Sequence, residues 1–154
     1  CDWSSDVCSS DLKSLSPEDS HASYLIMRSL SDIERIGDHC ENIMHQGSYS
    51  RRHKVIFSGE AQEELAKMVA LTKETLELSI TALSDADMDA AQQVTINEDM
   101  IDKMQSDYRK SHIRRLNAGI CNGNNGAVFL ELLGNLERIS DHCRNIAGYV
   151  LGEE

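Results

Sequence analysis

The chain has 154 residues, of which 40% are apolar and 27% charged, a composition typical of one globular domain rather than of a disordered chain. Its 26 acidic residues outnumber its 15 Lys and Arg, and the net charge of −11 repels phosphate backbones, which argues against a nucleic-acid partner. No apolar run reaches the ~20 residues of a membrane-spanning helix, so we expect this chain alone not to cross a bilayer. A single proline, two phenylalanines and an abundance of good helix formers favour an all-α fold.

The first twelve residues, CDWSSDVCSSDL, differ in kind from the rest of the chain. They have no basic start and no apolar stretch, so they are not a signal peptide, and they resemble the in-frame translation of a common sequencing adapter. We therefore expect residues 1–12 to be non-native and this sequence to be a fragment of a longer protein; a natural disordered tail is the alternative. The other cysteines, Cys40, Cys121 and Cys143, are odd in number and widely spaced, which is typical of reduced thiols in the cytosol.

Four long helices are predicted along the remainder. Ser16, followed by Pro17 and an acidic residue, is a capped helix start, and this helix is expected to run to about His45 and to end near Gly47. A basic linker over 46–58 then leads to a second start at Ser58. The second helix carries apolar residues at helical spacing: Leu65, Met68, Val69, Leu76, Ile80 and Leu83.

The second half of the chain continues this pattern. The sequence SDAD at 84–87 predicts a turn and a new cap, after which a third helix runs towards Leu116 with the apolar residues Ala91, Val94, Ile101, Met104 and Tyr108. Three glycines and three asparagines at 119–126 predict a loop, and a fourth helix is expected from about Ala127 to Leu151. Because short connections place long helices antiparallel, the predicted fold is an all-α antiparallel helical bundle.

An internal repeat carries most of the information in this sequence. LSDIERIGDHCENI at 30–43 matches LGNLERISDHCRNI at 133–146 at nine of fourteen positions, with a constant offset of 103 residues. Chance similarity of amphipathic helices explains the matched Leu and Ile but not the matched Asp-His-Cys, so we infer a duplicated helical unit. Each copy has an apolar stripe, formed by Ile33, Ile36, Cys40 and Ile43 in the first and by Leu132, Leu133, Leu136, Ile139, Cys143, Ile146 and Val150 in the second. Both cysteines are therefore expected to be small buried core residues.

Pairs of carboxylates four residues apart flank the apolar stripes of three predicted helices: Glu34 with Asp38, Glu98 with Asp102, and Glu137 with Asp141. Like charges at this spacing cost a few tenths of a kcal/mol on an isolated helix, so something should offset that cost. If the third and fourth helices pack side by side, their four carboxylates converge, and such oxygen ligands suit Mg, Mn, Fe or similar cations. The alternative is a set of solvated helix faces balanced by Arg35, Lys103, Arg109 and Arg138.

The histidines of the repeat and the basic end of the third helix are weaker indications of function. His39 and His142 follow the aspartates but lie well round the helix from the carboxylate row, which favours salt-bridged or solvated histidines over metal ligands. The third helix has a basic end, formed by Arg109, His112, Arg114 and Arg115. These residues either interact with the helix C-terminus or contact an anion or a partner.

Both copies of the repeat resemble the signature of PhoU-like domains, as IERIGDH at 33–39 and LERISDH at 136–142. The stretch 111–151 resembles more closely the PhoU-like cytosolic tail of bacterial sodium/phosphate cotransporters. The resemblance covers about residues 16–151 and implies two three-helix repeats. Residues 13–57 are then the last helix of the first repeat plus a linker, and residues 58–154 are the complete second repeat. The chain departs from the family in lacking the first two helices of the first repeat, and in having Ser140 where the pattern often has Gly.

The resemblance also implies metal clusters, held by Glu/Asp-x-x-x-Asp motifs on the second and third helices of each repeat. Carried over residue by residue, the second repeat supplies Glu98, Asp102, Glu137 and Asp141. The first repeat supplies only Glu34 and Asp38, so its site is incomplete. The implied cofactor is a divalent or trivalent metal such as Fe, Zn, Mn or Mg.

We therefore expect a non-enzymatic regulatory domain of a sodium-dependent phosphate cotransporter, acting in phosphate homeostasis on the cytoplasmic face of a bacterial membrane. Its partner is the transmembrane transporter domain of the parent chain, and a homo-oligomer is left open. The alternative is a stand-alone PhoU adaptor between a phosphate ABC importer and a sensor kinase. A third class, a di-metal carboxylate oxidase, needs Glu-x-x-His on two helices, and here only Glu18 and His21 have that spacing.

Overall fold

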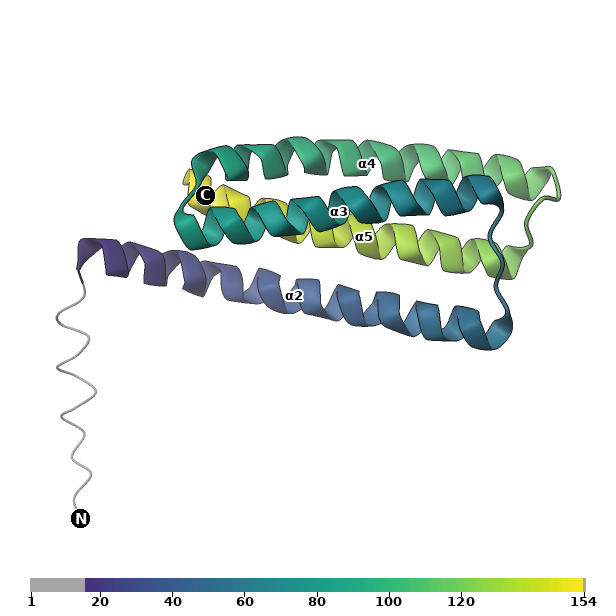
Figure 1. The fold of residues 1–154 in the computed structure, drawn as a ribbon, viewed down its shortest axis with the longest axis horizontal. Helices are drawn as coiled ribbons and strands as arrows, with labels where there is room; N and C mark the ends of the chain where they lie inside the picture. Colours follow the sequence, from purple (N-terminus) through teal and green to yellow (C-terminus); the bar gives the residue numbers. More distant parts are fainter. Residues whose placement is uncertain (1–15, 154) are drawn as a thin grey trace, which may run out of the picture.

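A computed structural model describes residues 16–153 and confirms an all-α bundle for this part of the chain (Figure 1). Its four long helices, in chain order, are α2 (Pro17–His53), α3 (Gly59–Asp85), α4 (Met88–Asn117) and α5 (Gly123–Leu151). Short connections join them, and successive helices run in opposite directions, as expected for an up-and-down bundle. The prediction that residues 1–12 are non-native lies outside the described residues.

Side-chain caps fix the start of each helix. Ser16 caps α2 and forms a capping box with Asp19, while Ser58 caps α3, as the sequence predicts. Asp87 accepts hydrogen bonds from two backbone N–H groups at the start of α4, which confirms the predicted turn and new cap at 84–87. Asn122 caps α5 by accepting one hydrogen bond, from the backbone N–H of Asn125. Each cap satisfies backbone donors that a helix cannot satisfy internally.

The predicted end of the first helix near Gly47 is wrong, because α2 continues to His53 and the linker is only 54–58. One glycine in a helix interior costs about 1 kcal/mol relative to alanine. This is too little to end a helix whose residues before and after the glycine make contacts with the rest of the bundle. Beyond Gly47, the Tyr49 hydroxyl hydrogen-bonds Asn124 of α5 at 2.9 Å, and its ring stacks on His53. The helix ends instead at Lys54, which adopts a left-handed conformation with φ 51°.

The predicted loop at 119–126 is also too long, since α5 begins at Gly123. Asparagine is a good N-cap, and Asn122 uses its side chain to accept from the backbone N–H of Asn125 at 2.8 Å. Gly126 lies in the first turn of α5 for a packing reason. A Cβ atom there would lie 2.4 Å from Cε1 of the buried His112, so only glycine lets α4 and α5 approach this closely.

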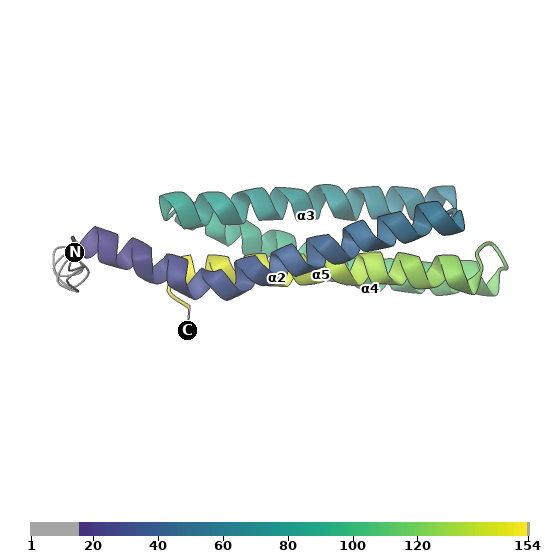
Figure 2. The ribbon, with the colours of Figure 1, turned by 90° about the horizontal axis from the view of Figure 1, so that it is seen from below.

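The helices form a three-helix bundle with a fourth helix on one side. α3, α4 and α5 each pack against the other two, whereas α2 packs mainly against α5 (Figures 1 and 2). In both views the first turns of α2 project beyond the neighbouring ends of the other helices. This arrangement fits the prediction of one complete three-helix unit plus the last helix of a preceding one.

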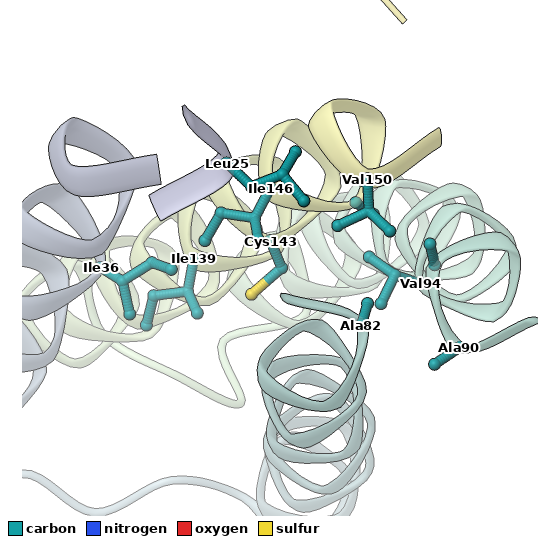
Figure 3. Packing of buried hydrophobic residues seen from close by; sticks show 11 residues of the cluster. Leu25, Ile36, Ala82, Ala90, Val94, Ile139, Cys143, Ile146 and Val150 are labelled. Atoms are coloured by element: carbon teal, nitrogen blue, oxygen red, sulfur yellow. The ribbon is translucent and has the colours of Figure 1, made fainter. Parts of the chain in front are cut away.

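The core lies along α5, whose predicted apolar stripe is confirmed as buried over its whole length. One cluster joins Ile139, Cys143 and Ile146 of α5 to Leu25 and Ile36 of α2 and to Ala82, Ala90, Ala91 and Val94 of the α3–α4 hairpin (Figure 3). A second cluster at the other end of the bundle contains Met68, Ile101, Phe129, Leu133 and Leu136. The predicted core positions of α4 are confirmed for Ala91, Val94 and Ile101, which are fully buried.

The predicted stripes of α2 and α3 need correction. In α3, Val69 and Ile80 are exposed, and the buried face contains Glu64, Thr72, Thr75 and Ser79 beside Met68 and Ala82. In α2, Ile36 is buried but Ile33 and Cys40 are exposed, so the prediction that Cys40 lies in the core is wrong. The reason is geometric: α2 packs mainly against α5, and an open apolar groove of about 430 Å³ lies between α2 and α3. Cys143, in contrast, is buried as predicted.

Candidate functional site

Three of the four carboxylates that the sequence predicts to converge between α4 and α5 do so. Oxygen atoms of Glu98, Asp102 and Asp141 all lie within 4.8 Å of one another, an arrangement that can hold a metal ion. Glu98 is buried, Asp102 is exposed, and Asp141 lies half-buried between them. Glu137, one turn before Asp141, lies outside this group of three but close enough to feel its charge.

The surroundings of this cluster disfavour negative charge. Burial raises the pKa of Glu98, Glu137 and Asp141 above their ordinary values. Asp102 raises all three further, and Asp141 does the same for Glu98 and Glu137. These shifts mean that the ionised cluster is strained by mutual repulsion unless a cation lies between its oxygens.

Arg144 of α5 partly balances this charge. Its Nη1 atom lies 2.6 Å from the Glu98 carboxylate and 3.8 Å from that of Asp99. One guanidinium still leaves the four carboxylates with excess negative charge. The donor set therefore fits a hard cation such as Mg, Mn or Fe, with Glu98, Asp102 and Asp141 as its ligands and Glu137 beside it. Sequence reasoning missed Arg144, although it stands three residues after Asp141 and hence on a neighbouring face of the same helix.

The two carboxylates of the first copy lie apart from this cluster. Glu34 and Asp38 are exposed on α2, and Asp38 lies 3.8 Å from Arg35 of its own helix. Among the described residues, neither of them belongs to a group of three possible metal ligands. The structure thus places the two copies of the motif in different surroundings. The incomplete metal site at Glu34 and Asp38 stays a prediction.

The histidines and asparagines of the repeat have a different role, because they join α2 to α5. Asp32 of α2 accepts hydrogen bonds from His142 at 2.8 Å, from Asn145 at 2.9 Å and from Tyr149 at 3.0 Å. Burial alone would raise the pKa of Asp32, but these three donors lower it below its ordinary value. Of the predicted salt-bridged and solvated alternatives for His142, the structure shows the pair with Asp32, and the expectation that it is not a metal ligand stays a prediction.

The same contacts recur with the two helices exchanged. Asn135 of α5 lies 3.0 Å from His39 and accepts a hydrogen bond from Asn42 at 3.4 Å. Adding 103 to Asp32, His39 and Asn42 gives Asn135, His142 and Asn145, so the two sets are equivalent in the repeat. The rings of His39 and His142 stack between them, with centroids 5.8 Å apart. The joint between α2 and α5 therefore has approximate twofold symmetry.

Sequence reasoning missed Asp32 and Asn135, which stand seven residues before each histidine and differ between the copies. The signal lay in the shared His-x-x-Asn, since two polar residues at i and i+3 on a packed face need partners on the facing helix.

The basic end of α4 is only partly solvated. His112 and Arg115 are buried, while Arg109 and Arg114 are exposed. Arg115 lies 2.8 Å from Glu64 and 3.4 Å from Glu60, both on α3. Desolvation would lower the pKa of Arg115, but these carboxylates raise it, so the residue is a structural cation between α3 and α4.

The family model for the PhoU domain matches residues 65–150. The chain belongs to the PhoU domain family. This match covers α4, nearly all of α5 and most of α3, and therefore includes the three converging carboxylates and Glu137. No solved structure gives a significant match to the chain. In the part of the chain that the structure describes, no helix has the length and apolar character needed to span a membrane.

Two curated relatives share the PhoU name. The phosphate-specific transport system accessory protein PhoU homolog 1 of Thermotoga maritima is 28% identical over 126 residues, which is 82% of this chain and 53% of that protein. The phosphate-specific transport system accessory protein PhoU homolog of Deinococcus radiodurans is 25% identical over 123 residues, or 80% of this chain and 56% of that protein. The chain thus spans about half the length of these relatives.

Proposed function

We propose that this chain is a non-catalytic regulatory domain of phosphate transport, of the kind that works as an accessory protein beside a transporter. The observation that carries the proposal is the match of most of the three-helix unit to the PhoU domain. The names of both relatives, which are accessory proteins of phosphate-specific transport systems, support a stand-alone adaptor. The proposed partner is the membrane transporter, which the chain would meet at the cytoplasmic face.

The test measures phosphate uptake in a bacterium whose own PhoU gene has been deleted. Expression of this chain should bring the rate of radiolabelled phosphate uptake back towards that of the undeleted strain. The control is the Leu133→Asp variant, which places a carboxylate at a fully buried position of α5 and should fail to fold. Equal uptake with the chain, with the control and with an empty vector would overturn the proposal.

We further propose that the cluster of Glu98, Asp102 and Asp141 binds a divalent or trivalent metal that holds α4 against α5. Its support is the convergence of their oxygens and the raised pKa of two of them, which a cation would relieve. The ion would replace repulsion between the two helices by attraction, and Glu137 would add to its negative surroundings.

Elemental analysis of three purified double variants tests this proposal. Glu98→Ala with Asp102→Ala should abolish bound metal, and Glu137→Ala with Asp141→Ala should do the same. Glu34→Ala with Asp38→Ala, the equivalent pair on α2, should leave bound metal nearly intact. The proposal fails if all three variants retain metal equally, or if the parent chain binds none at a pH where its carboxylates are ionised.

A sodium/phosphate cotransporter tail is the second candidate function, and the resemblance of residues 111–151 is the observation that favours it. The relatives support the stand-alone adaptor better, because neither is named as a cotransporter. The reading frame upstream of residue 13 in the parent gene separates the two. Several apolar spans there would identify a cotransporter, and a further PhoU repeat without such spans would identify an adaptor.

A further inference from the structure

One end of the bundle combines positive charge with exposed aliphatic side chains. The α2–α3 connection at 54–58 and the α4–α5 connection at 118–122 both lie at this end, which is on the right in Figure 1. The segments 46–58 and 109–126 at this end hold seven of the 15 Lys and Arg of the chain and no Asp or Glu, and the first two turns of α3 at the same end add Glu60, Glu63 and Glu64. Together these residues carry four more basic than acidic side chains. An acidic protein therefore has one basic pole, which we call the basic tip.

Most of the charges of the basic tip point outward. Arg51, Arg52 and Lys54 are exposed at the end of α2, and Arg109 and Arg114 are exposed at the end of α4. Lys110 is exposed and pairs with Asp107 at 3.2 Å, whereas the buried Arg115 is held by Glu60 and Glu64. The exposed cations therefore come from the ends of two helices, α2 and α4.

Each connection at this end also exposes an isoleucine to solvent. Ile56 is 74% exposed and Ile120 is 62% exposed, although both side chains are fully aliphatic. Near the same end of α4, Ile113 and Leu116 are also exposed. Exposed aliphatic groups surrounded by basic side chains are typical of surfaces that enter the interface of an anionic bilayer.

The two connections are fixed relative to each other. The Asn125 side chain donates a hydrogen bond to the backbone carbonyl of Ile56 at 2.8 Å, and the Tyr49 hydroxyl reaches Asn124 at 2.9 Å. The backbone segments that carry the two isoleucines are therefore already ordered before the protein binds a surface. This lowers the entropic cost of docking.

The opposite end of the bundle has the opposite charge. Asp85, Asp87 and Asp89 surround the α3–α4 turn, and Glu153 lies just beyond α5. A protein with a net charge of −11 is repelled by an anionic surface unless its basic pole faces that surface. The charge separation along the bundle would thus orient the molecule end-on.

We propose that the basic tip docks directly on an anionic lipid bilayer, with Ile56 and Ile120 among the headgroups and the flanking Arg and Lys on lipid phosphates. A free anion would leave both isoleucines in water, and so would a nucleic acid, so the exposed aliphatic groups favour the lipid surface. The inference goes beyond the proposed function, because it requires no transporter. It would hold the regulatory domain at the membrane with its long axis upright.

Co-sedimentation with lipid vesicles tests the proposal with the full chain. Vesicles of equal parts phosphatidylcholine and phosphatidylglycerol should carry the protein down, whereas phosphatidylcholine vesicles should not. Binding should weaken steeply as salt rises. Equal binding to both vesicles, or no binding to either at low salt, would overturn the proposal. Displacement by inorganic phosphate at constant ionic strength would overturn it as well, since it would indicate an anion site.

Matched variants locate the surface. Each basic residue near an anionic bilayer contributes roughly fivefold to the partition coefficient, so Arg51→Glu with Arg52→Glu should weaken binding at least about 25-fold. The control, Lys67→Glu with Lys73→Glu on α3, makes the same charge change away from the tip and should weaken binding much less. An equal loss in both variants would mean that only net charge matters, which contradicts the proposal.

A second pair of variants tests the apolar contribution. Ile56→Ser with Ile120→Ser should reduce binding at least tenfold, roughly what burying two aliphatic side chains provides. Ile80→Ser with Ile96→Ser changes two residues that are more than half exposed elsewhere and should leave binding unchanged. Because all four positions are exposed, unchanged circular dichroism is expected and folding is not in question. Loss of binding only in the Ile80 and Ile96 variant would place the surface elsewhere and reject the proposal.

Discussion

α2 and α5 contain copies of one repeated sequence, but their apolar stripes have different neighbours. Leu30, Ile33 and Cys40 on α2 correspond to Leu133, Leu136 and Cys143 on α5. The side chains on α5 are 0%, 5% and 0% exposed, whereas Leu30 is 57% and Ile33 46% exposed, and Cys40 is exposed too. The α3–α4 hairpin covers the stripe of α5, and the described residues include no equivalent hairpin over α2. A pattern thus identifies which face of a helix is apolar, but a neighbour decides whether that face is buried.

The polar residues of the two copies behave in the opposite way. The contacts of Asp32 with His142 and Asn145 repeat as those of Asn135 with His39 and Asn42. These residues use the face on which α2 and α5 meet, so each copy supplies the partner of the other. The polar residues of the two copies therefore lie in the same environment, whereas the apolar stripes of the two copies lie in different ones. Equivalent substitutions in the two copies can therefore measure what each environment contributes.

The largest difference is expected between the two cysteines. Cys143 is fully buried, and burial raises the pKa of its thiol to about 11, so labelling requires the structure to open. Cys40 is exposed and needs no opening. Mass spectrometry of native protein treated with a thiol reagent at neutral pH should show Cys143 reacting at least about a thousandfold more slowly than Cys40. Similar rates would contradict the difference in burial.

Truncating equivalent leucines in the two copies should change the free energy of unfolding by amounts that differ by several kcal/mol. Leu133→Ala removes a fully buried side chain and should lower the free energy of unfolding by about 2–5 kcal/mol. Leu30→Ala changes an exposed residue and should stay within about 0.5 kcal/mol. Urea unfolding followed by circular dichroism measures both. A loss of more than about 2 kcal/mol for Leu30→Ala would show that α2 is covered in solution.

The joint between the copies should show a smaller difference. Asp32→Ala leaves three donors without their charged acceptor and should cost about 1.5–3 kcal/mol, whereas Asn135→Ala removes neutral hydrogen bonds worth about 1 kcal/mol. Because the folded pKa of Asp32 is lowered, its contribution is present above its ordinary pKa of 3.8 and is lost as pH falls through the lower folded value. Urea titrations at neutral pH and near pH 3 check both statements. Equal costs at both pH values would show that the Asp32 charge contributes nothing.

The smallest expected effect concerns the carboxylate pairs in metal-free protein. In the presence of a chelator, Glu137→Gln with Asp141→Asn should raise the Tm at neutral pH by about 2–4 °C, which corresponds to about 1 kcal/mol. The folded pKa of both groups is raised, so ionisation destabilises the fold at neutral pH, and stability returns as pH falls through those values. The gain should therefore vanish below about pH 4.

The equivalent change on α2 is the control for this prediction. Glu34→Gln with Asp38→Asn alters two exposed groups and should leave the Tm within about 1 °C at every pH. Calorimetry measures both variants. A lower Tm for the α5 variant in metal-free protein would mean that these carboxylates have stabilising partners and are not strained.

Much of this fold follows from the sequence because its signals are local. Caps at Ser16 and Ser58, the 3.6-residue period and the short connections indicate four helices without knowledge of how they pack. The convergence of Glu98, Asp102 and Asp141 also follows, since it requires only that two predicted helices be neighbours. The family and the metal-ligand pattern rest on the same repeated motif.

The errors arose where a residue depends on a partner far along the chain. Gly47 did not end α2, because Tyr49 is held by Asn124 on another helix. Cys40 was placed in the core by its stripe, although no described helix covers it. His112 and Arg115 belong to the predicted basic end of the third helix, but their burial depends on other helices, since Gly126 makes room for the first and Glu64 pairs with the second. None of these contacts can be inferred from local periodicity.

The symmetry of the α2–α5 joint has a consequence for how such a protein can arise. In a twofold dimer of identical chains, the same surface of each chain meets at the interface, so every contact between two residues occurs twice. The α2–α5 joint has this pattern. Joining two such chains end to end requires a linker but no new recognition surface. Once joined, the halves are free to diverge, as Asp32 and Asn135 have done. The stacked His39 and His142 lie where the two unequal copies of the motif meet.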